Sequence, residues 1–100
     1  MRVIALRTIK QFIDGKPEYL DAREPALAWY RLVLDADWAS PSDIKREIAS
    51  ASILRDGRVV FNIAGNKYRI VVWINYLYRV VYIRFIGTHR QYDRIDAQTI

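Results

Sequence analysis

Residues 58–86 alternate between apolar and mixed positions, and this period of two constrains the fold more than any other feature of the sequence. Three runs rich in Val, Ile, Tyr, Phe and Trp, at 58–63, 67–75 and 79–86, are predicted to be β-strands. Ala64-Gly65-Asn66 provides turn residues between the first two runs, and Tyr76-Leu77-Tyr78 a less typical second turn. The segment therefore predicts a three-stranded antiparallel meander.

The two faces of this predicted sheet differ in chemistry. One face is almost purely apolar and is expected to pack on helices: Val59, Phe61, Ile63, Tyr68, Ile70, Val72, Ile74, Val81, Ile83 and Phe85. The other mixes cations with aromatic and apolar residues: Arg58, Val60, Asn62, Lys67, Arg69, Val71, Trp73, Val80, Tyr82 and Arg84. A polar outer face is common in half-exposed sheets. Arginines in mid-strand beside aromatic rings also suit phosphates and unstacked RNA bases, and this second interpretation is favoured.

The first half of the chain predicts helices that cover the apolar face. Residues 3–6 are predicted to form a short buried strand that joins the sheet. A first helix, capped by Thr8 and ended by Gly15 and Pro17, turns Ile9, Phe12 and Ile13 inward. A second begins between Asp21 and Pro25, with an inward stripe of Leu27, Tyr30, Val33 and Leu34; a third begins at Ser40-Pro41 and runs to about Ile48. Helices early and strands late predict one α+β domain over residues 1–100.

Positive charge is concentrated in the second half of the chain. Residues 1–57 hold nine Lys or Arg and nine Asp or Glu, whereas residues 58–100 hold seven cations and two carboxylates, so the net charge of +5 lies there. Such a concentration favours a polyanionic partner, although a solvated basic face explains it equally well. The chain has no cysteine and no apolar run long enough to span a bilayer. We therefore expect a cytoplasmic protein without disulfides, a thiolate nucleophile or a cysteine zinc site.

The segment after the last predicted strand contains the strongest candidates for chemistry. Thr88 and Gln91 have the spacing of a capping box, which predicts a short helix from about His89. His89 and Tyr92 then lie on one face of that helix, beside the basic face of the sheet. A lone histidine is most often structural, but this one is the only His in the chain and lies at a helix start, where phosphate binds well. No phosphate-binding glycine loop, HExxH motif or zinc centre is present, so a metal-free and cofactor-free reaction on a phosphodiester fits what remains.

Three segments in chain order resemble the HigB toxins of type II toxin–antitoxin systems. Residues 60–71 (VFNIAGNKYRIV) are similar to the family's FN(I/V)xGNxxR hairpin, apart from Ala64, where members often have Gly or Lys. Residues 81–93 resemble its YIRxxxTHxxYD segment, and residues 35–42 its AxW(x)SPxD stretch. Residues 95–100 match no motif. The resemblance spans nearly the whole chain and is therefore far more specific than any single motif.

The resemblance implies a RelE-like microbial ribonuclease fold, with helices on one face of a twisted antiparallel sheet, a short C-terminal helix, and RNA on the other face. It implies metal-independent cleavage of mRNA on the ribosome through the 2′-OH of the RNA, and neutralisation by a HigA-type antitoxin with a helix-turn-helix domain. Catalytic residues are then expected at Arg69, Arg84, His89 and Tyr92, with Lys67, Asn66, Arg90 and Tyr82 binding RNA. Asn66 also suits a plain turn role.

Two alternatives remain open from the sequence. The same basic, aromatic face would serve a non-catalytic RNA-binding domain. The helices would also serve an interaction module, in which Trp29, Tyr30 and Trp38 either anchor a partner or belong to the core.

Overall fold

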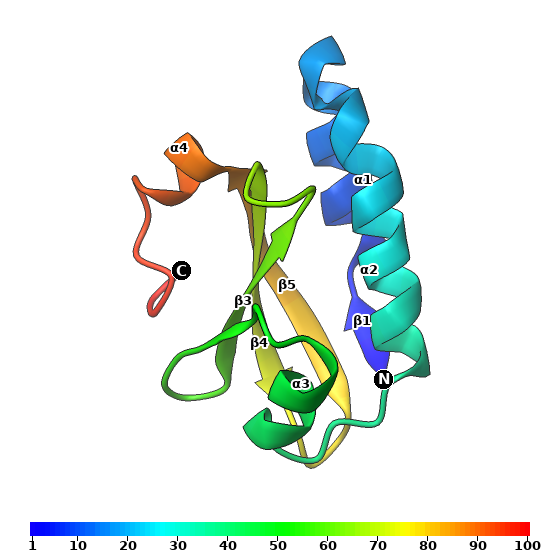
Figure 1. Cartoon of the computed structure of the whole chain (residues 1–100), viewed down its shortest axis with the longest axis vertical. Helices are drawn as coiled ribbons and strands as arrows, with labels where there is room; N and C mark the ends of the chain where they lie inside the picture. Colours follow the sequence, from blue (N-terminus) through cyan, green and yellow to red (C-terminus); the bar gives the residue numbers. More distant parts are fainter.

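The computed structural model describes residues 1–100 as three layers: helices, a five-stranded sheet, and a short helix with the C-terminal segment on the far side (Figure 1). The strands are β1 (Arg2–Ile4), β2 (Ser52–Ile53), β3 (Arg58–Ile63), β4 (Tyr68–Asn75) and β5 (Val80–Thr88), in the order β1-β5-β4-β3-β2. All pairings are antiparallel except β1 with β5, which is parallel. The predicted α+β class and meander are confirmed, and the N-terminal strand joins the sheet as expected.

The helices are α1 (Leu6–Gly15), α2 (Arg23–Asp35), α3 (Pro41–Glu47) and α4 (His89–Tyr92), with a 3₁₀ helix η1 (Pro17–Ala22) between α1 and α2. Figure 1 shows α1 and α2 along one face of the sheet and α4 on the other. No helix is long and apolar enough to cross a membrane. Neither η1 nor the two-residue β2 was predicted from the sequence.

The main core lies between the sheet and these helices. Its 21 buried residues include Ile9 and Ile13 of α1, Val33 of α2 and the predicted inner positions of β3 and β4. Trp38, fully buried in the loop between α2 and α3, stacks on Phe61 with 6.0 Å between ring centroids. Trp29 of α2 contacts the same ring, with 5.4 Å between centroids. Trp29 and Trp38 are therefore core residues. They are not available as anchors for a partner.

Two predicted details of the helices are wrong. Helix α1 begins at Leu6, because the chain passes from β1 into the helix directly through an extended Ala5, and the N–H of Thr8 already bonds to the carbonyl of Ala5 at 3.1 Å. Thr8 therefore lies inside the helix, and the strand predicted over residues 3–6 ends at Ile4. On α2 the buried residues are Ala26, Trp29 and Val33, and Tyr30 packs against the core, so the predicted stripe is right at Val33 and Tyr30, whereas Leu34 is 41% exposed.

A β-bulge changes the predicted face assignment at the end of β5. Val71 pairs with Phe85, but the next residue of β4, Val72, pairs with Ile83, so Arg84 is the extra residue. The bulge reverses the alternation beyond it. Phe85 therefore leaves the inner face predicted for it, and Ile86 enters the main core.

The C-terminal segment covers the middle of the outer face of the sheet. Ala97, only 8% exposed, packs on Val60 of β3 and Val71 of β4, forming a second apolar cluster with partly buried neighbours such as Phe85 and Tyr92. Residues 95–100, which matched no motif, thus complete a small outer core. This covering leaves the two ends of the outer face for polar and aromatic groups.

Candidate active site

Arg69, His89 and Tyr92 lie together at the end of the outer face where β4 and α4 meet. The Arg69 guanidinium carbon is 5.7 Å from the centroid of the Tyr92 ring, a cation–π arrangement. Nη1 of Arg69 donates to the carbonyl oxygen of Asn66 at 2.9 Å, which fixes the guanidinium over the β3–β4 turn. The backbone N–H of His89 donates to the carbonyl of Lys67 at 3.1 Å, and so ties the start of α4 to the same turn.

Helix α4 forms because its first turn is capped on both sides. The Thr88 hydroxyl accepts from the Gln91 N–H at 3.1 Å, and the Gln91 side chain accepts from the Thr88 N–H at 2.8 Å. The predicted capping box and helix start are confirmed. The Gln91 amide also donates to the Tyr19 hydroxyl at 3.2 Å, which links α4 to the helical layer. These contacts hold His89 and Tyr92 on a rigid support.

His89 has a carboxylate partner that the sequence analysis did not assign. Its Nδ1 lies 3.0 Å from Oδ2 of Asp93, one turn further along the chain. Nδ1 therefore faces the carboxylate, and Nε2 is the ring nitrogen without a carboxylate neighbour. The i, i+4 spacing of His and Asp on a predicted helix was the signal that could have identified Asp93. Both side chains are more than half exposed, so substrate can reach them.

Lys67, predicted to bind RNA, instead pairs with a carboxylate of the chain itself. The Lys67 ammonium pairs with the Asp21 carboxylate of η1, and the Tyr68 hydroxyl donates to the same carboxylate at 2.5 Å. The hydrogen bond from Lys67, followed by that from Tyr68, lowers the pKa of Asp21 below its ordinary value. Burial, assisted by Asp21, raises the pKa of Tyr68 to about 12. Lys67 is therefore already partly neutralised, and Asn66 contributes its backbone carbonyl to the site.

The structure does not bring Arg84 next to Arg69. Gly87 is opposite Arg69, so Arg84 lies three residues back along β5, roughly 10 Å at about 3.3 Å per residue. Arg84 is exposed at the bulge, and its Nε donates to the carbonyl oxygen of Ile100 at 3.3 Å. Tyr82 lies further along the same strand and contacts Trp73. Arg90 is exposed on α4, with no ion pair.

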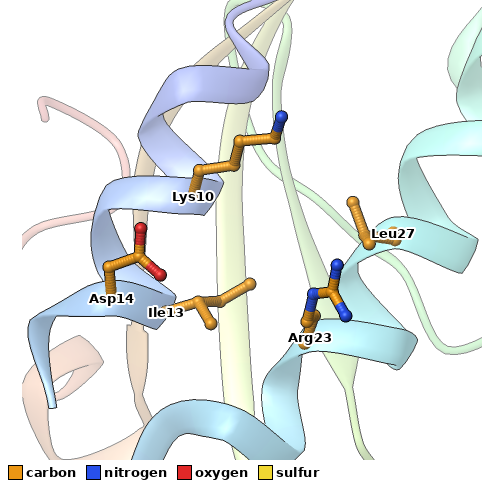
Figure 2. A pocket seen from close by; sticks show the side chains of 5 residues that line it. All are labelled: Lys10, Ile13, Asp14, Arg23 and Leu27. Atoms are coloured by element: carbon orange, nitrogen blue, oxygen red, sulfur yellow. The ribbon is translucent and has the colours of Figure 1, made fainter. Parts of the chain in front are cut away.

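One hollow opens beside the candidate site, and another lies on the helical side of the molecule. One, of about 490 Å³, separates Leu54 from residues 92–98 and has Tyr92 and Asp93 in its wall, so it opens beside the site. The other, of about 240 Å³, lies on the helical side, where Lys10, Ile13 and Asp14 of α1 face Arg23 and Leu27 of α2 (Figure 2). None of the predicted site residues lines this second hollow. No group of three or more His, Cys, Asp or Glu side chains converges to hold a metal ion, and metal-free chemistry stays a prediction.

Chemically, the cluster offers one fixed cation, one imidazole beside a carboxylate, and one phenol. This set can stabilise a negative charge and move protons on either side of it. It is exposed at the end of a face that carries further arginines, so an extended polyanion can reach it. The geometry therefore suits a phosphodiester better than a small neutral substrate.

Comparison with known proteins assigns the chain to a family. Residues 22–95 match the family model for the HigB toxin, a RelE-like toxic component of a toxin–antitoxin system. The mRNA interferase toxin HigB of Escherichia coli strain K12 is 27% identical over 94 residues, which cover 92% of this chain and 90% of the relative. The mRNA interferase HigB of Escherichia coli O6:H1 is 22% identical over 68 residues, 66% of each chain. The family match covers α2, α3, strands β2 to β5 and the candidate site: this chain belongs to the HigB family of RelE-like toxins.

Proposed function

We propose that this chain is a cytoplasmic endoribonuclease toxin that cleaves mRNA on the ribosome, using the 2′-OH of the RNA as the nucleophile. The observation that supports this best is the cluster of Arg69 over Tyr92 beside the His89–Asp93 pair, on the face opposite the helices. The relatives are named as mRNA interferases, which points to the same substrate.

In the proposed reaction the 2′-oxygen forms a bond to the adjacent phosphorus while the bond to the 5′-oxygen breaks. The products are a 2′,3′-cyclic phosphate and a 5′-hydroxyl end. Negative charge builds on the phosphoryl oxygens of the transition state, and Arg69 is positioned to meet it. Its guanidinium remains charged, and a preorganised donor of this kind is worth about 2.7–4 kcal/mol in other enzymes.

His89 and Tyr92 move the two protons. Nε2 of His89 accepts the proton of the 2′-OH, since the Asp93 carboxylate lies against Nδ1, on the other side of the ring. Tyr92 gives its hydroxyl proton to the leaving 5′-oxygen. We assign this role to Tyr92 because its phenol hydroxyl can donate a proton.

Asp93 is a positioning residue in this scheme. We expect Asp93→Ala to lower the single-turnover cleavage rate without weakening RNA binding, because the imidazole loses its orientation. Asp93→Asn keeps an oxygen beside Nδ1, and should recover part of the rate. Equal rates for wild type and Asp93→Ala would remove Asp93 from the mechanism. Arg94→Ala, at the next exposed position, is the matched control.

Dependence on the ribosome is tested by comparing two substrates at matched salt and concentration. The site holds only one imidazole and one nearby phenol, which is a small set for strong catalysis on free RNA. We expect mRNA bound to translating ribosomes to be cleaved far faster than naked mRNA, with new 5′ ends mapped in both. Equal rates would refute ribosome dependence. Binding to RNA without any new 5′ ends would instead identify a non-catalytic RNA-binding domain.

We further propose that a HigA-type helix-turn-helix antitoxin binds the helical side, formed by α1 and α2, and leaves the Arg69 site open. Three exposed leucines lie on this side, Leu20 at 61%, Leu32 at 40% and Leu34 at 41% exposed, and the hollow of Figure 2 lies between its helices. Arg69→Ala/Arg84→Ala should then bind the antitoxin as wild type does across a salt series. A loss of two or more orders of magnitude, about 2.8 kcal/mol, would show that the active face is covered instead.

A further inference from the structure

A second aromatic group lies on the outer face, at the end of the sheet away from α4. Trp73 of β4 and Tyr82 of β5 are cross-strand partners whose ring centroids are 5.2 Å apart with planes tilted by 34°. Both are half-buried, and neither belongs to the main core or to the outer apolar cluster under Ala97. Two large rings are therefore paired with each other on a surface, without a core that accounts for them.

The loop between β2 and β3 packs against the Trp73 ring of this pair. Gly57, at φ +80°, lets the β2–β3 loop approach the indole so closely that a Cβ there would lie 3.1 Å from Trp73 Nε1 and 2.7 Å from the carbonyl oxygen of Ile74. The carbonyl of Gly57 accepts from the Ile74 N–H at 2.8 Å. The loop thus restrains the Trp73 ring from one side, so this side chain loses less conformational entropy when a ligand stacks on it.

Cations surround the aromatic pair. Arg58 is directly opposite Trp73 on β3, Arg84 is two residues from Tyr82 on β5, and exposed Arg2 lies on β1 opposite Val80. Arg58 and Arg84 each donate to the carbonyl oxygen of Ile100, but a guanidinium has five N–H donors, so most remain free. Aromatic rings framed by arginines are the chemistry that binds single-stranded nucleic acid, with bases on the rings and phosphates on the cations.

We propose that Trp73 and Tyr82 form a stacking platform for a base of the mRNA, a few nucleotides from the scissile phosphate. The inference deepens the proposed function. Arg69 and Trp73 are four residues apart on β4, roughly 13 Å at about 3.3 Å per residue, within reach of a short extended RNA. Exposed Arg84 lies between them along β5 and contacts the connecting phosphates.

Tryptophan fluorescence reports this platform selectively, because Trp29 and Trp38 are buried and Trp73 is not. A short single-stranded RNA with 2′-O-methyl riboses, which cannot be cleaved through the 2′-OH, should quench the emission of the wild type on binding. Trp73→Phe should lose the quench and keep most of the affinity, since a ring remains. Full-strength binding of the wild type without any quench would overturn the proposal.

Affinity provides the second measurement. We expect Tyr82→Ala and Trp73→Ala each to weaken binding about 5- to 150-fold, the range for one base–aromatic stack. Tyr78→Ala is the matched control, at a 72% exposed tyrosine outside the platform. In a series of RNAs that each carry one abasic nucleotide at a different position, one member should bind the wild type more weakly than the intact RNA does. Tyr82→Ala should bind that member and the intact RNA with equal affinity, and this comparison does not require Trp73→Ala to fold. Equal affinity of the wild type for every member of the series would reject the platform.

Cleavage separates this inference from the proposed function. On ribosome-bound mRNA, Tyr82→Ala should raise the half-saturating concentration while leaving the single-turnover rate close to that of the wild type. If Arg69→Ala abolishes cleavage but Tyr82→Ala changes neither binding nor half-saturation, the platform is wrong and the enzyme assignment stands. If neither the wild type nor any variant cleaves mRNA, yet Tyr82→Ala weakens RNA binding, the platform stands and the enzyme assignment fails.

Discussion

Replacing Phe61 by alanine should be among the most destabilising changes in the chain. Phe61 is 1% exposed on the inner face of β3 and lies between two indoles, at 5.4 Å from Trp29 and 6.0 Å from Trp38. Phe→Ala in a core typically costs about 3–5 kcal/mol, and two aromatic partners place this site in the upper half of that range. Because one kcal/mol shifts the Tm of a domain this size by about 4–8 °C, the Tm should fall by at least about 16 °C.

Urea unfolding followed by far-UV circular dichroism measures this loss without relying on the indoles beside the substitution. Phe85→Ala is the matched control, since the bulge at Arg84 moves Phe85 to the half-buried outer cluster. We expect Phe85→Ala to cost less than half as much as Phe61→Ala. Equal losses from the two variants would contradict the bulged register, because a regular alternation would place both rings in the same core.

Three further predictions concern the turn and the C-terminal segment. The pKa of Asp21 is lowered by Lys67 and Tyr68, so its pairing stabilises the fold above the unfolded pKa of about 3.8 and loses that effect as the pH falls further. Thermal unfolding should therefore show Asp21→Asn to be less stable than wild type at pH 7, with the difference vanishing in acid. A difference that does not depend on pH would contradict this. Since the pKa of Tyr68 is about 12, stability gained from its neutral form should be lost between about pH 10 and 12, and ultraviolet titration should show one late phenol that Tyr68→Phe removes. Ala97→Asp would bury a carboxylate on Val71 and should cost at least about 1 kcal/mol in urea unfolding, unlike Thr99→Asp at an exposed site; equal stability would show that the segment does not pack there.

Most of the sheet was predictable because alternation is a local property of the strands. The bounds predicted for β3 match the structure, and Val59, Phe61 and Ile63 all face the core. The bulge was not predictable in this way, since it depends on which residues of β4 pair with β5. A shift of one residue there exchanges the faces of Phe85 and Ile86.

The helical half was harder to predict, because helix phase depends on what each helix packs against. The sequence around α2 offers Leu27, Tyr30 and Leu34 as plausible inward residues, yet the structure turns Trp29 inward to meet Phe61. Residues 95–100 form no regular element, so no period revealed that Ala97 covers the sheet. Such packing between distant segments leaves little local signal.

The candidate site was predictable to the extent that its residues are local. Thr88 and Gln91 placed the start of α4, and thereby His89 and Tyr92 on one short helix. The contact of Tyr92 with Arg69 and the distance of Arg84 from that pair required the sheet register. The Lys67–Asp21 pair joins residues 46 positions apart, which the pattern of the sequence could not indicate.

The most direct test of the proposed enzyme is the rate at which Arg69→Ala cleaves mRNA on translating ribosomes. Arg69 is on the outer face, where truncation leaves no core cavity, and Arg31→Ala on the exposed side of α2 is the matched control. We predict a single-turnover rate about 100- to 1,000-fold below wild type for Arg69→Ala, with an unchanged Tm and with Arg31→Ala at the wild-type rate. Wild-type cleavage by a folded Arg69→Ala would contradict the assignment of this cluster as the active site.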